Sequence, residues 1–404
     1  MLIKVILQLR EDTILKKLKG TRTAGLEKLT EFFERSKDKQ YGQLRNYELG
    51  PLHHPHVSIL SPYTRYRLVS EQELTRKALA SSGKAVNEKF IKEILWRTYW
   101  KGYMERRPSI WDSYQQMLQK PLSEDLSKRI AKATDGSTGI DAFDAWISEL
   151  NTSGYLHNHA RMWFASIWIH TLKLPWYWGA ELFLDRLIDG DPAVNTLSWR
   201  WVAGLHTKGK TYLARKSNIV KYTKGRFEPS GLSDEAPLIE ESIDHPLTSL
   251  VSLPHKPSLN SYDGLIVTME DLTVDENLFA KFDSWPQIIM VDRKKTVFEV
   301  PDQFRKEAFE DAKLRLGKHS NQPVKVISCF SELDANGTYV GYLPPVGKVK
   351  DLLQNASDSV QFDWLRRPWD DILWPESSGG FFKYFKKGWP LIQSLLEKKG
   401  TQVG

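Results

Sequence analysis

The hydrophobic pattern of this 404-residue chain changes once along its length, and that change constrains the fold more than any other feature. Up to about residue 230, apolar side chains recur at three- and four-residue steps, as in "GLEKLTEFFERS" and "NEKFIKEILWRTYWKGYM", a period typical of helices packed on a core. From about residue 261, short apolar runs such as "GLIVTM", "QIIMVD" and "VKVIS" alternate with helical stretches, which favours a parallel sheet covered by helices. The sequence therefore predicts a mainly α protein in which a helical domain precedes a smaller α/β domain.

A stretch rich in proline, serine and acidic residues separates the two patterns. The segment "EPSGLSDEAPLIEESIDHPLTSLVSLPHKPSLNS" shows neither period, so we interpret it as a linker or a long meandering loop. Because 404 residues exceed what one core ordinarily encloses, two domains are expected. We place the helical domain at residues 1–230, the linker at 231–260 and the α/β domain at 261–404.

Charge, cysteine content and aromatic content narrow the classes of function. A net charge of +7 and a pI near 9.1 permit nucleic acid as a partner. The single cysteine excludes disulfides within the chain, cysteine-rich zinc sites and cysteine-ligated iron–sulfur clusters. Ten of the 15 tryptophans lie between positions 96 and 201. A buried core accounts for some of them, and a surface that stacks on flat ligands or bases would account for more.

Targeting and metal signals are weak. No segment reaches the length of a membrane span, and no cleavage site follows the N-terminal apolar run, so a cytoplasmic protein without a membrane partner is expected. The "HHPH" run at 53–56 contains proline in a loop-like setting, which favours a solvated turn over a metal site. A phosphate-binding glycine fingerprint and a hydrolytic Ser/His/Asp order are both missing.

Four stretches mix hydrogen-bonding groups with aromatic residues. They are "YGQLRN" with "VSILSPYTRYRLVS", then "EILWRTYW", "GYLHNHARM" and "LIDGDPAVNTLSWRW". The helix start expected near Ser61 offers hydroxyl and backbone amide groups that suit a phosphate. Taken singly, each stretch is more often a core segment or a helix cap than a site.

Taken together, these stretches resemble the flavin-binding helical domain of the photolyase/cryptochrome family in order and in spacing. The resemblance covers about residues 24–230, and "GYLHNHARM" followed by "LIDGDPAVNTLSWRW" is its most specific part. It implies that the chain binds FAD. The cofactor-binding residues that it implies are Tyr41, Val57, Ser58, Ile59, Leu60, Ser61, Arg161, Asp189, Gly190, Asp191 and Asn195.

The resemblance also implies roles within this set. Tyr41 and the run from Val57 to Ser61 match the phosphate and ribityl side of the FAD site. Arg161 and Asp189 match a cation and carboxylate beside the isoalloxazine ring.

The same resemblance implies a substrate and a path for electrons. Glu93, Trp96, Arg97, Asn158, Met162 and Trp201 match residues that contact a DNA lesion: a carboxylate on its bases, two aromatic walls, a phosphate contact and the remaining side of the pocket. Family members that repair the (6-4) lesion generally carry His at the positions of Asn158 and Met162, so the cyclobutane dimer is favoured. Trp199 and Trp176 match the two inner members of an electron-transfer chain, Asn195 faces flavin N5, and these three with Glu93 form the implied catalytic set.

Two departures from the family pattern bear on these expectations. The outer tryptophan of the electron-transfer chain is missing, because residue 123 is Ser, so we expect flavin photoreduction either to run through another aromatic residue such as Trp178 or Trp168 or to be slow. The family's α/β domain comes first, whereas here "GLIVTMEDLTVDENL" and "GGFFKYFKKGWPLI", which are similar to its opening and closing segments, follow the helical domain. We interpret this order as a circular permutation, with an unrelated appended α/β domain as the alternative. No motif specifies an antenna pigment.

Three functions compete at this point. The first is blue-light-driven repair of cyclobutane pyrimidine dimers in DNA, the activity of a deoxyribodipyrimidine photolyase. The second is a cryptochrome-type photoreceptor without repair activity, and the third is a nucleic-acid-binding flavoprotein without photochemistry. The lesion-pocket residues favour repair. The expected partner is DNA containing pyrimidine dimers, and a monomer without a metal is expected.

Overall fold

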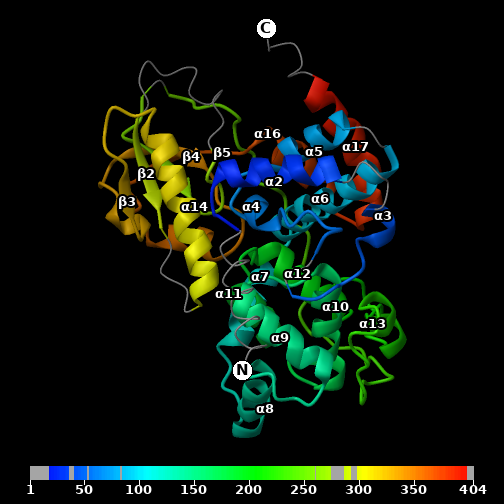
Figure 1. The fold of residues 1–404 in the computed structure, drawn as a ribbon. Helices are drawn as coiled ribbons and strands as arrows, with labels where there is room; N and C mark the ends of the chain where they lie inside the picture. The colour runs from blue at the N-terminus through cyan, green and yellow to red at the C-terminus, as the bar shows by residue number, and fades with distance from the viewer. Residues whose placement is uncertain are drawn as a thin grey trace, which may run out of the picture.

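The computed structural model describes residues 18–35, 41–51, 54–81, 84–259, 261–273, 286–292 and 298–397. Twelve α-helices precede the first strand in this part of the chain (Figure 1): α2 (Arg22–Arg35), α3 (Tyr41–Leu44), α4 (Ser61–Arg65), α5 (Glu71–Ala80), α6 (Lys84–Glu105), α7 (Ser109–Leu118), α8 (Glu124–Thr134), α9 (Asp141–Ser153), α10 (Asn158–Ser166), α11 (Trp176–Arg186), α12 (Pro192–Val202) and α13 (Lys216–Tyr222). A π-helical turn, η2 (Ile167–Thr171), continues α10.

Local sequence sets the break between α9 and α10. Gly154 ends α9 in the left-handed conformation, with φ of 63°, which glycine adopts without steric cost. A Cβ atom there would also lie 2.8 Å from Ile188 Cγ1, because the backbone N–H of Ile188 donates to the Gly154 carbonyl at 2.8 Å. The α9–α10 turn therefore packs directly against the turn that leads into α12.

The second part of the chain forms a five-stranded sheet whose pairings are all parallel, in the order β3-β2-β1-β4-β5. Its strands are β1 (Gly264–Thr268), β2 (Gln287–Val291), β3 (Lys325–Ile327), β4 (Thr338–Tyr342) and β5 (Gln361–Leu365). Its helices and 3-10 turns are α14 (Glu299–Gly317), η4 (Phe330–Glu332), α15 (Lys348–Asp351), η5 (Leu352–Asn355), α16 (Pro368–Leu373), η6 (Trp374–Glu376) and α17 (Phe381–Glu397). The predicted fold class, a helical part followed by a smaller α/β part, is confirmed.

The last helices pack on the helical part of the molecule. Figure 1 shows α17, in red, beside α6 and α5, and both α16 and α17 contact α6. One continuous hydrophobic core runs from Leu29 in α2 to Ile392 in α17, while a smaller cluster covers the other face of the sheet. The domain boundaries stay predictions, because residues 368–397 belong by sequence to one part and by packing to the other.

The segment predicted as a linker carries neither helix nor strand between residues 228 and 259. It is nevertheless held to the rest of the molecule near its middle and near its C-terminal end. Arg200 of α12 holds Glu241 with two hydrogen bonds of 2.6 Å, and the backbone N–H of Ser258 donates to Asp363 of β5 at 2.7 Å.

Candidate cofactor and substrate site

A cavity of about 550 Å³ opens in the helical part of the molecule. Its walls come from α3, the segment before α4, α6, the α9–α10 turn, α10, α11 and α12. It brings together residues predicted from the sequence for cofactor and for substrate: Tyr41, Val57, Ser58, Ile59, Leu60, Ser61, Glu93, Trp96, Arg97, Asn158, Arg161, Met162, Asp189, Gly190, Asn195, Trp199 and Trp201. Two predicted residues, Asp191 and Trp176, do not line it.

An ion pair with one unused oxygen lies on the cavity wall. Arg161 Nη2 donates to Asp189 Oδ2 at 2.9 Å, and Arg161 Nε donates to the Leu156 carbonyl at 2.9 Å. Asp189 Oδ1 is buried and has no hydrogen-bond partner in the protein. A buried carboxylate oxygen without a donor is costly, and an N–H or O–H group of a ligand or of a water molecule in the cavity would satisfy this atom.

Glu93 of α6 is held by two neighbours. Tyr41 Oη donates a hydrogen bond to Glu93 Oε2, and Arg45 Nη1 lies 2.8 Å from Glu93 Oε1. The Glu93 side chain keeps 41% of its surface exposed, yet its position inside the cavity raises its pKa, although Arg45 and Tyr41 act in the opposite direction. The predicted position of Tyr41 on the phosphate side of a cofactor stays a prediction; Tyr41 lines the cavity, and its hydroxyl contacts this carboxylate. Arg45 was not predicted as a site residue, although it lies within the quoted "YGQLRN" stretch.

Asp191 caps α12 from behind the cavity wall. Its Oδ1 accepts hydrogen bonds of 3.0 Å from the backbone N–H groups of Ala193 and Val194, as an N-cap residue does. Burial alone would raise the pKa of Asp191, but Lys101 and Arg97 hold it below its ordinary value. The Asp-Pro pair in "GDPAVN" thus starts a helix, a structural role that the sequence signal also fits.

Arg97 points inward. Its Nη2 donates to Asp191 Oδ2 at 2.8 Å, its Nε lies 3.5 Å from Glu71, and only 10% of its side chain is exposed. Its role as a contact for DNA phosphate stays a prediction, and in this geometry its charge is already balanced by two buried carboxylates.

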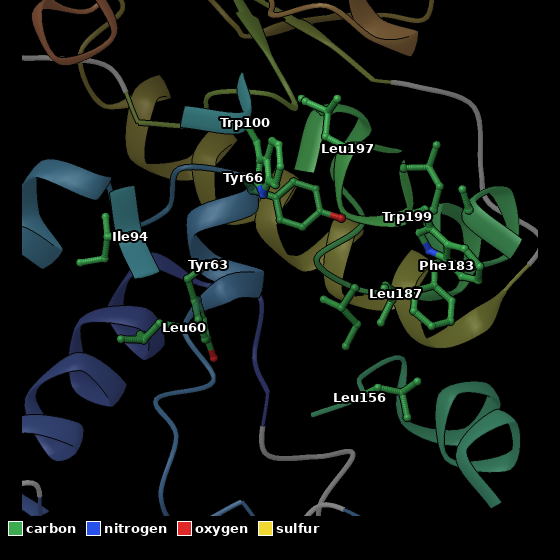
Figure 2. Packing of buried hydrophobic residues seen from close by; sticks show 14 of the residues in the cluster. Leu60, Tyr63, Tyr66, Ile94, Trp100, Leu156, Phe183, Leu187, Leu197 and Trp199 are labelled. Carbon is green, nitrogen blue, oxygen red and sulfur yellow. The ribbon is translucent and has the colours of Figure 1, made fainter. Parts of the chain in front are cut away.

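Asn195 and Trp199 form the wall contributed by α12. Asn195 Nδ2 donates to the Ala180 carbonyl of α11 at 2.7 Å, which fixes the amide. The Trp199 ring packs edge-on against Phe183 at 5.1 Å, and Figure 2 shows the two side by side above Leu187. A Cβ atom on Gly179 would come within 2.3 Å of the Trp199 ring, so only glycine fits there.

Aromatic contacts lead from Trp199 toward α10 and η2. The Trp168 ring lies 6.3 Å from the Trp199 ring, and the Trp168 Nε1 donates to the Pro175 carbonyl at 2.9 Å. Trp176, the predicted second member of the electron-transfer chain, packs against Tyr114 with ring centres 5.9 Å apart. At the position of the missing outer tryptophan, Ser123 caps α8 by accepting a hydrogen bond from Leu126 N.

The predicted substrate side of the cavity has two supported aromatic walls. Trp96 stacks on Phe381 of α17 with ring centres 3.7 Å apart and planes 8° apart. Trp201 stacks on Tyr212 at 5.7 Å. Both indoles are therefore held in place from behind, which leaves flat faces for a ligand.

Asn158 and Met162 lie four residues apart on α10, with Asn158 Nδ2 3.9 Å from Met162 Sδ. Both line the same cavity as the two aromatic walls, as predicted from the sequence.

Buried ion pairs join the cavity wall to the sheet. Arg65 Nε donates to the Gly190 carbonyl at 2.6 Å, and its two Nη atoms donate to Glu270, after β1, at 2.6 and 2.8 Å. Nearby, Arg67 makes two hydrogen bonds to Asp370 and one to Asp271. These groups fill the crevice at the carboxyl ends of β1, β4 and β5, leaving about 20 Å³.

The described residues also bear on metal binding and on membrane-spanning helices. In the described ranges, His, Cys, Asp and Glu form no group of three or more that could hold a metal ion. His53 lies outside the described residues, and His54 is buried with Nε2 3.5 Å from Glu149. Among the same ranges, no helix is long and apolar enough to cross a membrane.

Part of this chain is similar in sequence to known proteins. Residues 90–232 match the family model described as the FAD binding domain of DNA photolyase. A deoxyribodipyrimidine photo-lyase of Streptomyces griseus is 36% identical over 169 residues, which are 41% of this chain and 36% of that protein. A cryptochrome DASH of Gloeobacter violaceus is 28% identical over 258 residues, 61% of this chain and 48% of the relative. The chain thus spans less than half the length of these relatives. The solved structure of a Synechocystis cryptochrome has a TM-score of 0.45 and 27% identity, covering 51% of this chain and 44% of its own.

Proposed function

We propose that this chain, whose residues 90–232 belong to the FAD-binding domain family of DNA photolyase, binds FAD in the 550 Å³ cavity and repairs cyclobutane pyrimidine dimers in DNA under blue light. The observation that carries the proposal is that one cavity gathers the residues expected for cofactor and for lesion. A cofactor and a substrate base that share a cavity lie close enough for direct electron transfer.

The polar groups of the cavity fit an isoalloxazine ring. Asp189 Oδ1 is an acceptor without a donor, which suits an N–H at the edge of the ring, and Arg161 beside it supplies a cation that favours a reduced, anionic flavin. Trp199 and Phe183 supply an apolar surface. The cavity volume lies within the range of small-molecule and cofactor sites.

The segment before α4 fits the polar chain of the cofactor. Ile59 adopts a φ of 51°, which costs a β-branched residue about 1–3 kcal/mol and turns the backbone at the cavity wall. No side chain caps the start of α4, and Pro62 in its first turn has no N–H to be satisfied. Ser58 and Ser61 add hydroxyl groups.

When bound and reduced, FAD supplies light-driven transfer of a single electron to a substrate. The residues of the chain orient the cofactor and the substrate and enclose them in the cavity. Asn195, fixed by its bond to Ala180, holds one side of the site. Glu93 has a raised pKa, which increases the fraction of the protonated form that can donate a hydrogen bond to a pyrimidine carbonyl.

The substrate assignment rests on the side of the cavity formed by α6, α10 and α12. Trp96 and Trp201 offer flat walls for a pair of bases turned out of the duplex, a displacement that costs a few kcal/mol and least where pairing is already damaged. Asn158 and Met162 occupy positions at which family members that repair the (6-4) lesion generally carry His. Their identity here therefore favours the cyclobutane dimer as the substrate.

A photoreceptor role is the second candidate. The cryptochrome DASH alignment spans 61% of this chain, more than the 41% of the Streptomyces photo-lyase alignment. A receptor would use the same flavin site but would not need the lesion walls.

A repair assay separates the two functions. Purified, reduced protein is incubated with an oligonucleotide carrying one thymine dimer, in blue light and in darkness, and restored thymines are measured. Repair in light alone is expected, and Glu93→Gln should reduce it while FAD stays bound. Full retention of FAD with no repair in light would exclude the photolyase activity and favour the receptor.

A further inference from the structure

Helix α17 has one buried face and one face that stays exposed among the described residues. Its buried residues are Phe381, Tyr384, Gly388 and Ile392, which pack toward α6 and α16. On the outer face, Phe382 is 78% exposed, more than any other large apolar side chain in the described ranges. Lys383, Lys386 and Lys387 surround it, and all three are exposed.

This outer face begins beside the substrate side of the cavity. Phe381 stacks on Trp96 at 3.7 Å, and Trp96 lines the cavity, so Phe382 follows directly after the residue that supports a cavity wall. Lys92 of α6, which pairs with Glu88 at 2.6 Å, lies 5.0 Å from the ring of Phe385 and so joins α6 to α17 beside this face. Figure 1 shows α17 running alongside α6.

Two of the three lysines on this face, Lys383 and Lys386, carry charge that no ion pair balances within the described residues. Lys387 pairs with Glu376 at 2.9 Å, but no ion pair to a carboxylate is found there for Lys383 or Lys386. On α8, two exposed lysines, Lys128 and Lys132, also lie close together, and Lys128 pairs with Glu124 at 2.6 Å, but no exposed aromatic ring lies on that helix. Unbalanced cations beside an exposed aromatic ring are the combination that binds a nucleic acid strand: phosphates take the charges and a base or sugar packs on the ring.

We propose that the outer face of α17 binds the DNA strand next to the displaced bases, with Lys383 and Lys386 on phosphates and Phe382 against a neighbouring nucleotide. The inference rests on the proposed function, since it takes DNA as the substrate. It adds a second contact area, supplied by the last helix of the chain, to the cavity itself.

The test compares two double variants that lose equal charge. Lys383→Gln with Lys386→Gln changes α17, and Lys128→Gln with Lys132→Gln changes α8, which Figure 1 shows on the opposite side of the molecule from α17. Binding of a labelled duplex carrying one thymine dimer is measured by fluorescence anisotropy across salt concentrations, on protein loaded with FAD.

The α17 variant is expected to bind at least about tenfold more weakly at low salt, and the slope of log affinity against log salt should fall by about 1.8, or about 0.9 per lost phosphate contact. The α8 variant should stay within about twofold of the wild type. Phe382→Ala is expected to weaken binding several-fold without changing the slope, because it removes no charge.

Equal losses in the α17 and α8 variants would overturn the inference, since net charge alone would then explain them, and so would an unchanged slope in the α17 variant. Wild-type protein that holds FAD but does not bind the duplex would instead overturn the proposed repair function itself. Flavin content and circular dichroism of each variant show whether it is folded, and Phe382→Ala tests the same face without touching its charge.

Discussion

Substitution of Glu270 by Gln tests whether the α/β part of the chain shapes the FAD cavity. Arg65 Nε donates a hydrogen bond to the Gly190 carbonyl in the cavity wall, and both Arg65 Nη atoms donate to Glu270. Only 6% of the Arg65 side chain and 4% of the Glu270 side chain are exposed. Glu270→Gln keeps the shape but removes the charge that holds the guanidinium in place.

The structure gives the size of the expected effect. Removing one partner of a buried ion pair costs about 3–5 kcal/mol, and the acceptor that Gln retains places the loss of stability near the low end, at about 3 kcal/mol. A hydrogen bond from a charged donor contributes about 1.5–3 kcal/mol. If the bond to Gly190 loosens by about half and this loss appears in cofactor binding, FAD binding weakens by about 0.8–1.5 kcal/mol, a loss of affinity of about fourfold to tenfold.

Asp370→Asn is the matched control. Asp370 pairs with Arg67 through hydrogen bonds of 2.6 and 2.8 Å, and Asp370 is also 4% exposed, but no hydrogen bond of Arg67 reaches the Asp189–Gly190 turn. Asp370→Asn should lose some stability in urea unfolding, although less than Glu270→Gln because Arg67 keeps Glu71 and Asp271, and only Glu270→Gln should lower FAD affinity in a flavin fluorescence titration. Equal losses of affinity in both, or wild-type affinity in Glu270→Gln, would refute the reasoning.

Three further outcomes are expected from the site. Asn158→His combined with Met162→His should lower dimer repair at least about tenfold with FAD still bound, because lesion contacts worth a few kcal/mol are lost; unchanged repair would contradict the substrate assignment. Trp168→Phe and Trp176→Phe should each slow the light-driven reduction of oxidised flavin, because the Trp168 ring contacts the Trp199 ring and the family resemblance implies Trp176 as a member of the electron path. The rate is measured from flavin absorbance under blue light with an external reductant present. A wild-type rate in either variant would show that electrons do not pass through that residue. Burial, with neighbouring histidines, lowers the pKa of His157 to about 3, so the unfolded chain takes up this proton near pH 6.5 and the folded chain does not. Stability should therefore fall as pH drops from 6.5 toward 3, by about 1.4 kcal/mol per pH unit, and His157→Gln should reduce the slope of urea stability against pH by that amount.

Periodicity predicted most of the fold. The break between α9 and α10 was predicted at "NTSG", where Gly154 adopts its left-handed conformation, and the first three strands were predicted within two residues. The strands β4 and β5 were not predicted, and a physical feature of each strand explains why its pattern is weak. Gly341 lies inside β4 because a Cβ atom there would come within 2.6 Å of the Ile266 carbonyl, and glycine weakens a strand pattern. In β5, an edge strand, burial does not alternate.

The site was predicted less completely, because residue types do not reveal partners. Arg97 and Asp191 belong to recognised motifs, yet they bind each other, a contact between α6 and the start of α12 that periodicity does not predict. Phe381 could not be linked to Trp96 from the sequence, since their contact depends on the packing of the last helix on α6. The circular permutation stays a prediction.

The most direct test of the account is the flavin content of the purified chain. The unpaired Asp189 oxygen, the Arg161 cation and the apolar wall at Trp199 predict a yellow protein that releases about one FAD per chain on denaturation, measured by absorbance and chromatography. Asp189→Ala, which removes the orphaned acceptor, should lower that content. A colourless protein that cannot be reconstituted with FAD would contradict the central claim.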